Sequence, residues 1–242
     1  MLFRSELPVE MTAFKTQQFR WAKGLIQVGL KILPRVLRAD QPKHVKSEAA
    51  YHMLANFSYP LMIVLALLSF PAMIIRFYQG WFQMLYIDLP LMAAATFSVS
   101  AFYMGSQKEL FPDDWQRSFR YLPMILATGV GLTLTNTWAV IEALRGKQSE
   151  FVRTPKYHIE ANADEWIGKK YRQSFVVQPL IEMALGLYFT ATVFYALANG
   201  IYGTLPFLIL FQVGFLYMGL TSIVQQFAGD EVVLNPATEE EI

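Results

Sequence analysis

Apolar segments of membrane length dominate this chain. A transmembrane helix needs about 20 mostly apolar residues, and the sequence contains segments near that length at residues 53–77, 81–104, 121–144, 176–198 and 201–224. Hydrophobic residues make up 54% of the chain and charged residues only 16%, whereas an ordinary globular domain has about 25% charged residues. We therefore predict an all-α membrane protein.

The segment at 121–144 differs from the other four, because polar residues crowd its centre and two glycines precede them. These residues are Gly129, Gly131, Thr133, Thr135, Asn136 and Thr137. Such a composition is less suited to a lipid-facing span than that of the other four segments.

The distribution of lysine and arginine predicts the topology. Residues 1–50 contain nine basic residues and residues 145–175 contain seven, and short basic loops stay on the cytoplasmic side of a membrane. If all five segments crossed, these two regions would lie on opposite sides. We therefore predict four crossings at 53–77, 81–104, 176–198 and 201–224. The segment 121–144 becomes an interfacial or re-entrant helix, the loop 145–175 is cytoplasmic, and both termini are cytoplasmic.

Residues 21–38 have the pattern of an amphipathic helix. Lys23, Gln27, Lys31 and Arg35 recur every four residues and so share one face. The other face is apolar, with Leu25, Ile26, Ile32, Leu33, Val36 and Leu37. A basic stripe opposite a broad apolar face predicts a helix that lies on an anionic membrane surface.

Several kinds of site are excluded or disfavoured by composition. The chain has no cysteine, which excludes disulfides, thiolate metal sites and cysteine nucleophiles. His44, His52 and His158 are scattered, without the spacing of metal ligands. A net charge of +1 gives no indication of nucleic-acid binding.

The pentapeptide Gln17-Gln18-Phe19-Arg20-Trp21 reads Q-Q-x-R-W. On a helix, Gln17, Arg20 and Trp21 stand at i, i+3 and i+4 and share a face. A guanidinium suits a pyrophosphate, an amide suits phosphate or sugar oxygens, and an indole offers a flat apolar face to a sugar ring. The structural alternative is a helix at the membrane surface, with Trp21 as interfacial anchor and Arg20 facing lipid phosphate.

Together with the membrane segments, this motif resembles the processive, membrane-embedded family 2 glycosyltransferases, which include cellulose synthase, hyaluronan synthase and plant glucomannan synthases. The resemblance implies that Trp21 lies beneath the terminal sugar of the acceptor, and that Gln17, Gln18 and Arg20 contact the diphosphate of the donor. The family fills the position of Gln18 variably.

A second motif is similar to the F-x-V-T-x-K gating loop of cellulose synthases. Phe151, Thr154 and Lys156 match it, whereas Arg153 stands where the family has valine. The resemblance implies a cytoplasmic loop that closes over the donor nucleotide and excludes water. The alternative is a basic juxtamembrane loop, which the positive-inside rule alone would explain.

Other parts of such an enzyme are not found in residues 1–242. The family carries its donor-binding aspartates, D-x-D metal motif and catalytic base on an α/β nucleotide-binding domain. We therefore expect that domain, with Mg or Mn, to be missing from the N-terminus, and we assign no catalytic or metal-binding residue in this chain. The chain alone is expected to be inactive.

The resulting organisation has three parts. Residues 1–50 contain the end of the glycosyltransferase domain and the interfacial motif helix, residues 51–228 form the membrane channel domain, and residues 229–242 form a disordered acidic tail.

The implied reaction is inverting transfer from a UDP- or GDP-sugar to a growing β-linked glycan, which is threaded through a membrane, expected to be the bacterial inner (plasma) membrane. The expected partners are membrane lipids, a glycan acceptor and the catalytic domain, in the same or a separate chain, with no nucleic acid. The alternative is a non-catalytic translocation subunit or an unrelated transporter. The sequence does not identify the sugar.

Overall fold

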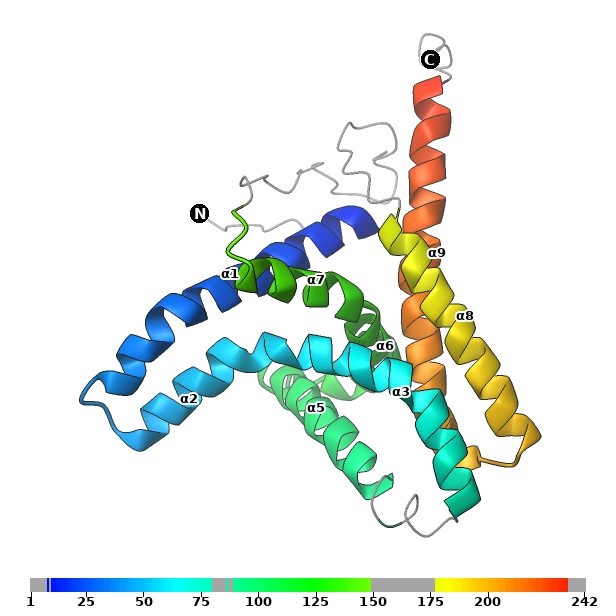
Figure 1. Cartoon of the computed structure of the whole chain (residues 1–242), viewed down its shortest axis with the longest axis horizontal. Coiled ribbons are helices and arrows are strands. Elements are labelled where there is room, and N and C mark those ends of the chain that lie inside the picture. Colours follow the sequence, from blue (N-terminus) through cyan, green and yellow to red (C-terminus); the bar gives the residue numbers. More distant parts are fainter. Residues whose placement is uncertain (1–7, 9, 80–85, 87–88, 149–176, 235–242) are drawn as a thin grey trace. The chain divides into compact units, whose positions relative to one another are not determined.

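The computed structural model describes residues 8, 10–79, 86, 89–148 and 177–234 (Figure 1). Within these residues every regular element is a helix and none is a strand, and they include four helical stretches that are long and apolar enough to cross a membrane. The prediction of an all-α membrane protein is therefore confirmed. The elements are α1 (Met11–Arg38), α2 (Lys43–Leu54), η1 (Ala55–Phe57), α3 (Ser58–Gln79), α5 (Leu89–Leu110), η3 (Trp115–Tyr121), α6 (Leu122–Gly131), α7 (Thr133–Leu144), α8 (Val177–Ala198), η4 (Tyr202–Thr204) and α9 (Leu205–Leu234).

Three of the four apolar stretches overlap predicted crossings, and the fourth does not. By length and composition they are Lys43–Ile75, Trp115–Leu144, Val177–Ala198 and Tyr202–Phe227. The stretch that ends at Leu144 contains the segment expected to be interfacial. The predicted crossing 81–104 is not among the four found in the described residues; α5 begins at Leu89, and most of residues 80–88 lie outside the description.

Proline and glycine mark the helix boundaries. A proline lacks the backbone N–H that a first turn leaves unpaired anyway, and α3, α5, α6, α8 and α9 each have one in their first turn: Pro60, Pro90, Pro123, Pro179 and Pro206. At the other end, Gly146 after α7 and Gly200 after α8 have φ values of 67° and 69°. The backbone N–H groups that follow each helix return to its last carbonyls, which is the Schellman arrangement.

The polar segment at the centre of 121–144 coincides with a helix boundary. α6 ends at Gly131 and α7 begins at Thr133, with Leu132 between them. Of the polar residues that follow, Thr133, Thr135 and Asn136 are buried. The polar residues therefore face neighbouring helices and not the surface.

The helices divide into two units. The first consists of residues 1–63, 132–182 and 218–242, and the second of residues 64–131 and 183–217. In the first, α1 packs along α7, as Figure 1 shows, and α2 returns beside α1. Ile26 of α1 packs with Val140 and Ala143 of α7, and Phe57 covers this cluster.

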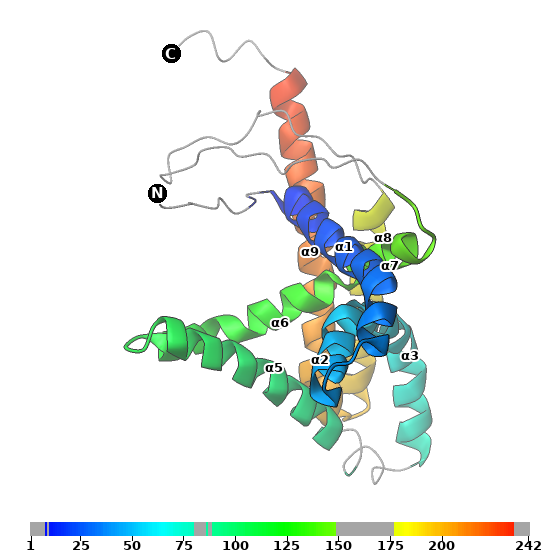
Figure 2. The same cartoon turned by 90° about the vertical axis from the view of Figure 1, so that its left-hand side faces the viewer.

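The second unit has an aromatic core. Phe189 and Phe215 stack with their ring centroids 6.0 Å apart, and Phe211 packs against both. The Tyr188 hydroxyl donates to the backbone carbonyl of Leu67. In the same unit α5 and α6 are joined by η3 (Figure 2).

The end of α9 differs from the sequence-based prediction. A disordered tail was expected from residue 229, but α9 continues to Leu234. Extending an existing helix costs far less free energy than nucleating one, so a few polar residues after Phe227 do not end it. Residues 235–242 lie outside the described part.

Gly214 tests the packing of the second unit. A Cβ atom at this position would overlap the backbone carbonyl oxygen of Ala127 in α6. We expect Gly214→Ala to lower the free energy of unfolding by about 1–3 kcal/mol, as overpacking typically does. A melting curve of the purified protein in detergent measures the loss. Gly129→Ala is the matched control, because its Cβ would meet no atom within 4 Å; equal melting temperatures for the two variants would contradict this packing.

Candidate functional site

The Q-Q-x-R-W motif lies in the first half of α1. Since α1 is continuous from Met11 to Arg38, Gln17, Arg20 and Trp21 share one helical face. Trp21 is 62% exposed, whereas Gln17 and Arg20 are partly buried. The motif therefore presents one large aromatic surface, flanked by an amide and a guanidinium.

The opposite face of α1 is buried. Lys15, Ala22 and Ile26 follow each other at intervals of seven and four residues, which places them on one side of the helix. By the same helical geometry, that side is roughly opposite Gln17 and Trp21. Packing of α1 against its neighbours thus leaves Trp21 exposed, with Gln17 and Arg20 partly buried beside it.

Gln18 lies beside the shared face. It is three residues before Trp21, so the two side chains are neighbours on the helix surface, and Gln18 is partly buried. Phe19, between Gln18 and Arg20, lies under a cation: the Lys23 Nζ is 5.7 Å from the centroid of its ring.

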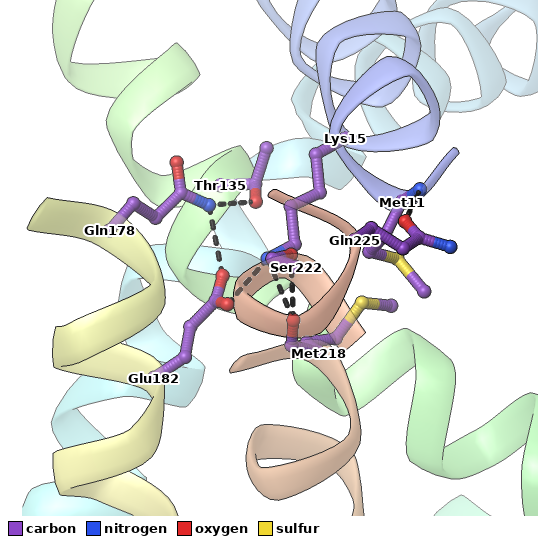
Figure 3. Close-up of polar contacts among 8 residues, drawn as sticks. All are labelled: Met11, Lys15, Thr135, Gln178, Glu182, Met218, Ser222 and Gln225. Carbon is purple, nitrogen blue, oxygen red and sulfur yellow. Dashed lines mark hydrogen bonds and ion pairs between the residues drawn. The ribbon is translucent and has the colours of Figure 1, made fainter. Parts of the chain in front are cut away.

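A buried ion pair holds the start of α1 in place (Figure 3). The Lys15 ammonium donates to the Glu182 carboxylate of α8 at 2.5 Å, to the Ser222 hydroxyl of α9 at 2.7 Å and to the Met218 carbonyl at 3.1 Å. These contacts use all three of its N–H donors. Lys15 is 6% exposed and Glu182 0% exposed. Burial lowers the pKa of Lys15 below its ordinary value, an effect that the Glu182 charge opposes.

The same carboxylate extends the network to α7. The Gln178 amide donates to Glu182 Oε1 at 2.9 Å and to the Thr135 hydroxyl at 2.6 Å. Figure 3 shows these side chains converging from α1, α7, α8 and α9. We call this set of residues, Lys15, Thr135, Gln178, Glu182 and Ser222, the Lys15 network.

The first turn of α1 has a further polar anchor. Its N-terminal N–H groups lack partners inside the helix, and the Met11 N–H donates to the Gln225 side-chain oxygen of α9 at 2.7 Å. The Met11 side chain packs with Leu132 and Met218. The register of α1 against α9 is thus fixed by contacts immediately before the motif.

A second ion pair begins two residues beyond the motif. The Lys23 ammonium donates to one oxygen of the Glu142 carboxylate at 2.9 Å, and Lys147 donates to the other at 2.6 Å. Lys23 is buried. The prediction that Lys23 belongs to an exposed basic stripe is therefore wrong: its charge is paired with α7, whereas Lys31 and Arg35 are exposed.

Sequence reasoning found the motif face but missed the contacts that support it. Glu182 is a carboxylate in an apolar segment, and such a group usually has a polar or charged partner. Its partner, however, lies 167 residues away in the sequence. Lys15 begins the polar stretch 15–18, where nothing local distinguishes a buried lysine from an exposed one.

Other predicted features lie outside this geometry. Phe151, Thr154 and Lys156 of the gating-like motif are not among the described residues. No group of three or more histidine, cysteine, aspartate or glutamate side chains occurs in the described part at spacings that suit a metal ion.

Replacing one member of the buried ion pair should destabilise the protein strongly. We expect Lys15→Met to lower the free energy of unfolding by about 3–5 kcal/mol, because it leaves Glu182 buried without its cation. The double variant Lys15→Met/Glu182→Met should recover much of that loss, which a double-mutant cycle on detergent melting curves measures. Arg117→Met removes the exposed pair with Asp114 and should cost at most about 1 kcal/mol. Additive single effects at Lys15 and Glu182 would show that the pair does not couple.

No family model, curated protein or solved structure matches the chain. The candidate site is therefore defined by this chain's own residues. It consists of the face formed by Gln17, Arg20 and Trp21, with Gln18 beside it, and of the two buried ion pairs behind it.

Proposed function

We propose that this chain is the acceptor-binding and channel-forming membrane part of an inverting family 2 β-glycosyltransferase. The donor is a UDP- or GDP-sugar, and the product is a β-linked glycan that passes through the membrane. The observation that carries the proposal is the outward face of α1, where Trp21, Gln17 and Arg20 lie together.

The exposure of Trp21 supports a role as a sugar platform. An indole ring contributes its binding energy when its flat face is covered, and more than half of this side chain is uncovered. A pyranose ring has an apolar face of suitable size. Trp21 thus holds the terminal sugar of the acceptor by stacking.

Gln17 and Arg20 lie within one helical turn of that platform. Arg20 offers a planar, permanently charged group that pairs with phosphate oxygens through two donors, and the Gln17 amide adds a neutral donor. Gln18 adds a second amide donor from the adjoining face of the helix. The leaving diphosphate and the acceptor sugar would therefore meet on one helix, which favours reaction by fixing their relative positions.

The rigidity of α1 supports this role. The Lys15 network lies just before the motif, and the Lys23–Glu142 pair lies just after it. Both are buried, and each joins α1 to another helix of the same unit. A binding face held from behind in this way loses little conformational freedom when ligand binds.

The groups that catalyse bond formation are not among the residues of α1 discussed above. The catalytic base and a Mg or Mn ion would belong to an α/β nucleotide-binding domain, in the same or a separate chain. The residues Phe151, Thr154 and Lys156 would then close over the donor as a gating loop.

The topology that goes with this function has both termini in the cytoplasm. α1 carries exposed basic residues in its second half, so it lies in the cytoplasmic interface. α7 packs along α1 and would lie at the same level, as proposed for an interfacial helix. A bacterial inner membrane fits this arrangement.

The first test concerns Trp21. In source membranes supplied with radiolabelled UDP-glucose, GDP-mannose or UDP-N-acetylglucosamine, we expect Trp21→Ala to lower sugar transfer by roughly a hundredfold, or ~2.7 kcal/mol. Trp21→Phe should retain part of the activity, because it keeps an aromatic face.

Trp138→Ala is the matched control, since Trp138 is also exposed, at 53%, but lies on α7. Equal transfer by Trp21→Ala and Trp138→Ala membranes would favour a non-catalytic translocation subunit. Absence of transfer from all three donors in wild-type membranes would also contradict the proposal.

A second test separates the two ligands of the face. Arg20→Lys keeps the charge but loses the planar fork, so the KM for the donor and the inhibition constant of the free nucleoside diphosphate should both rise about tenfold. The KM for an added acceptor oligosaccharide should stay the same. A variant that changes only the acceptor KM would place Arg20 on the sugar and not on the diphosphate.

A further inference from the structure

An apolar groove lies between the second half of α1 and the end of α2. It has a volume of about 370 Å³, within the range of roughly 300–1,000 Å³ that is typical of small-molecule sites. Apolar side chains and Gly29 form most of its wall, and Arg38 is the one charged residue among those that line it. The lining residues are Ile26, Gly29, Leu30, Leu33, Pro34, Leu37, Arg38, Met53, Leu54 and Phe57.

The two helices approach closely within the groove. A Cβ atom on Gly29 would lie 3.3 Å from the Cβ of Met53, so α1 and α2 touch there. Leu33 and Leu37 continue the α1 side of the groove, and Leu54 and Phe57 form the other side together with Met53. Leu30 and Leu37 are exposed although they are apolar. The described residues therefore do not cover this apolar surface.

The other wall of the groove indicates a lipid environment. Met53, Leu54 and Phe57 belong to the stretch Lys43–Ile75, which is long and apolar enough to cross a membrane. Leu33 and Ile26 of α1, on the opposite wall, lie on the side of that helix away from Trp21. The groove thus opens toward the membrane-entering segment, where lipid acyl chains are the abundant apolar ligands.

The chain that follows the lining residue Arg38 is basic. Residues 38–46 contain three lysine or arginine residues, Arg38, Lys43 and Lys46, and one acidic residue, Asp40. The first turn of α2 contains Lys43 and Lys46 and no acidic residue. Lysines at the N-terminus of a helix are repelled by the positive end of its dipole. A bound anion would offset this repulsion and the repulsion between the neighbouring basic residues.

We propose that this groove binds an anionic phospholipid, with one acyl chain between α1 and α2 and the phosphate at Arg38 and Lys43. The length of the groove suits an extended acyl tail, because its lining is continuous along three turns of α1 from Ile26 to Leu37. The site is on a different face of α1 from the sugar motif, so lipid binding can be tested independently of sugar transfer.

Native mass spectrometry of the purified chain tests the proposal. The probes are phosphatidylglycerol and phosphatidylcholine with identical acyl chains, added to delipidated protein in detergent. We expect one retained phosphatidylglycerol at an affinity at least tenfold above that of phosphatidylcholine. Leu33→Trp, which fills the groove, should lower the affinity for both lipids about tenfold, whereas Leu61→Trp, at an exposed position of α3 outside the groove, should not.

Arg38→Gln tests the headgroup contact without altering the groove. It should remove the preference for phosphatidylglycerol and leave phosphatidylcholine binding unchanged, whereas Arg145→Gln, an equal change of charge at another exposed site, should keep the preference. Glycerol phosphate, which has the anion but no acyl chain, should not compete at millimolar concentration. Equal retention of the two lipids by the wild type, full competition by glycerol phosphate, or retention unaffected by Leu33→Trp would each overturn the proposal.

Discussion

The burial of one lysine organises the first unit of this protein. A charged ammonium loses much hydration free energy when it leaves water, so it must find full replacement partners. Lys15 has them only because α1, α8 and α9 all contribute: a carboxylate, a hydroxyl and a backbone carbonyl meet at its three donors. Gln178 then ties the same carboxylate to Thr135 of α7. A shift of any of these helices would leave a buried charge incompletely paired, and this penalty fixes the position of α1.

The candidate site depends on that constraint through helical geometry. Lys15 and Ile26 face inward, so the residues about half a turn away must face outward. Gln17, Arg20 and Trp21 therefore share the side of α1 that faces away from this packing, and Trp21 is the most exposed of the three. Lys23, paired with Glu142, fixes the same helix again two residues after Trp21. The second half of α1 is free of such pairs in the described contacts and instead borders the apolar groove. One helix thus presents a polar face in its first half and an apolar groove in its second.

Local sequence patterns were sufficient for some of these features and not for others. Helix type, the approximate spans of α8 and α9, and the shared face of the motif follow from apolar length and from 3.6-residue periodicity. The boundary at Leu132 coincides with the glycines and threonines around it. The roles of Lys15 and Lys23 did not follow, because each depends on a carboxylate more than one hundred residues away. For Lys23 the local pattern was misleading, since four-residue spacing with Lys31 and Arg35 suggested one exposed stripe. Periodicity shows which residues share a face, but only tertiary contacts show which part of that face is buried.

Fluorine NMR would test the central claim most directly. The chain has five tryptophans, and 5-fluorotryptophan labelling gives each its own signal, with Trp21→Phe assigning that of Trp21. Titration of the purified protein with a short β-linked oligosaccharide should shift the Trp21 signal in a saturable manner and leave that of Trp138 in place. If the oligosaccharide binds while the Trp21 signal stays unchanged, the outward face of α1 is not the acceptor site.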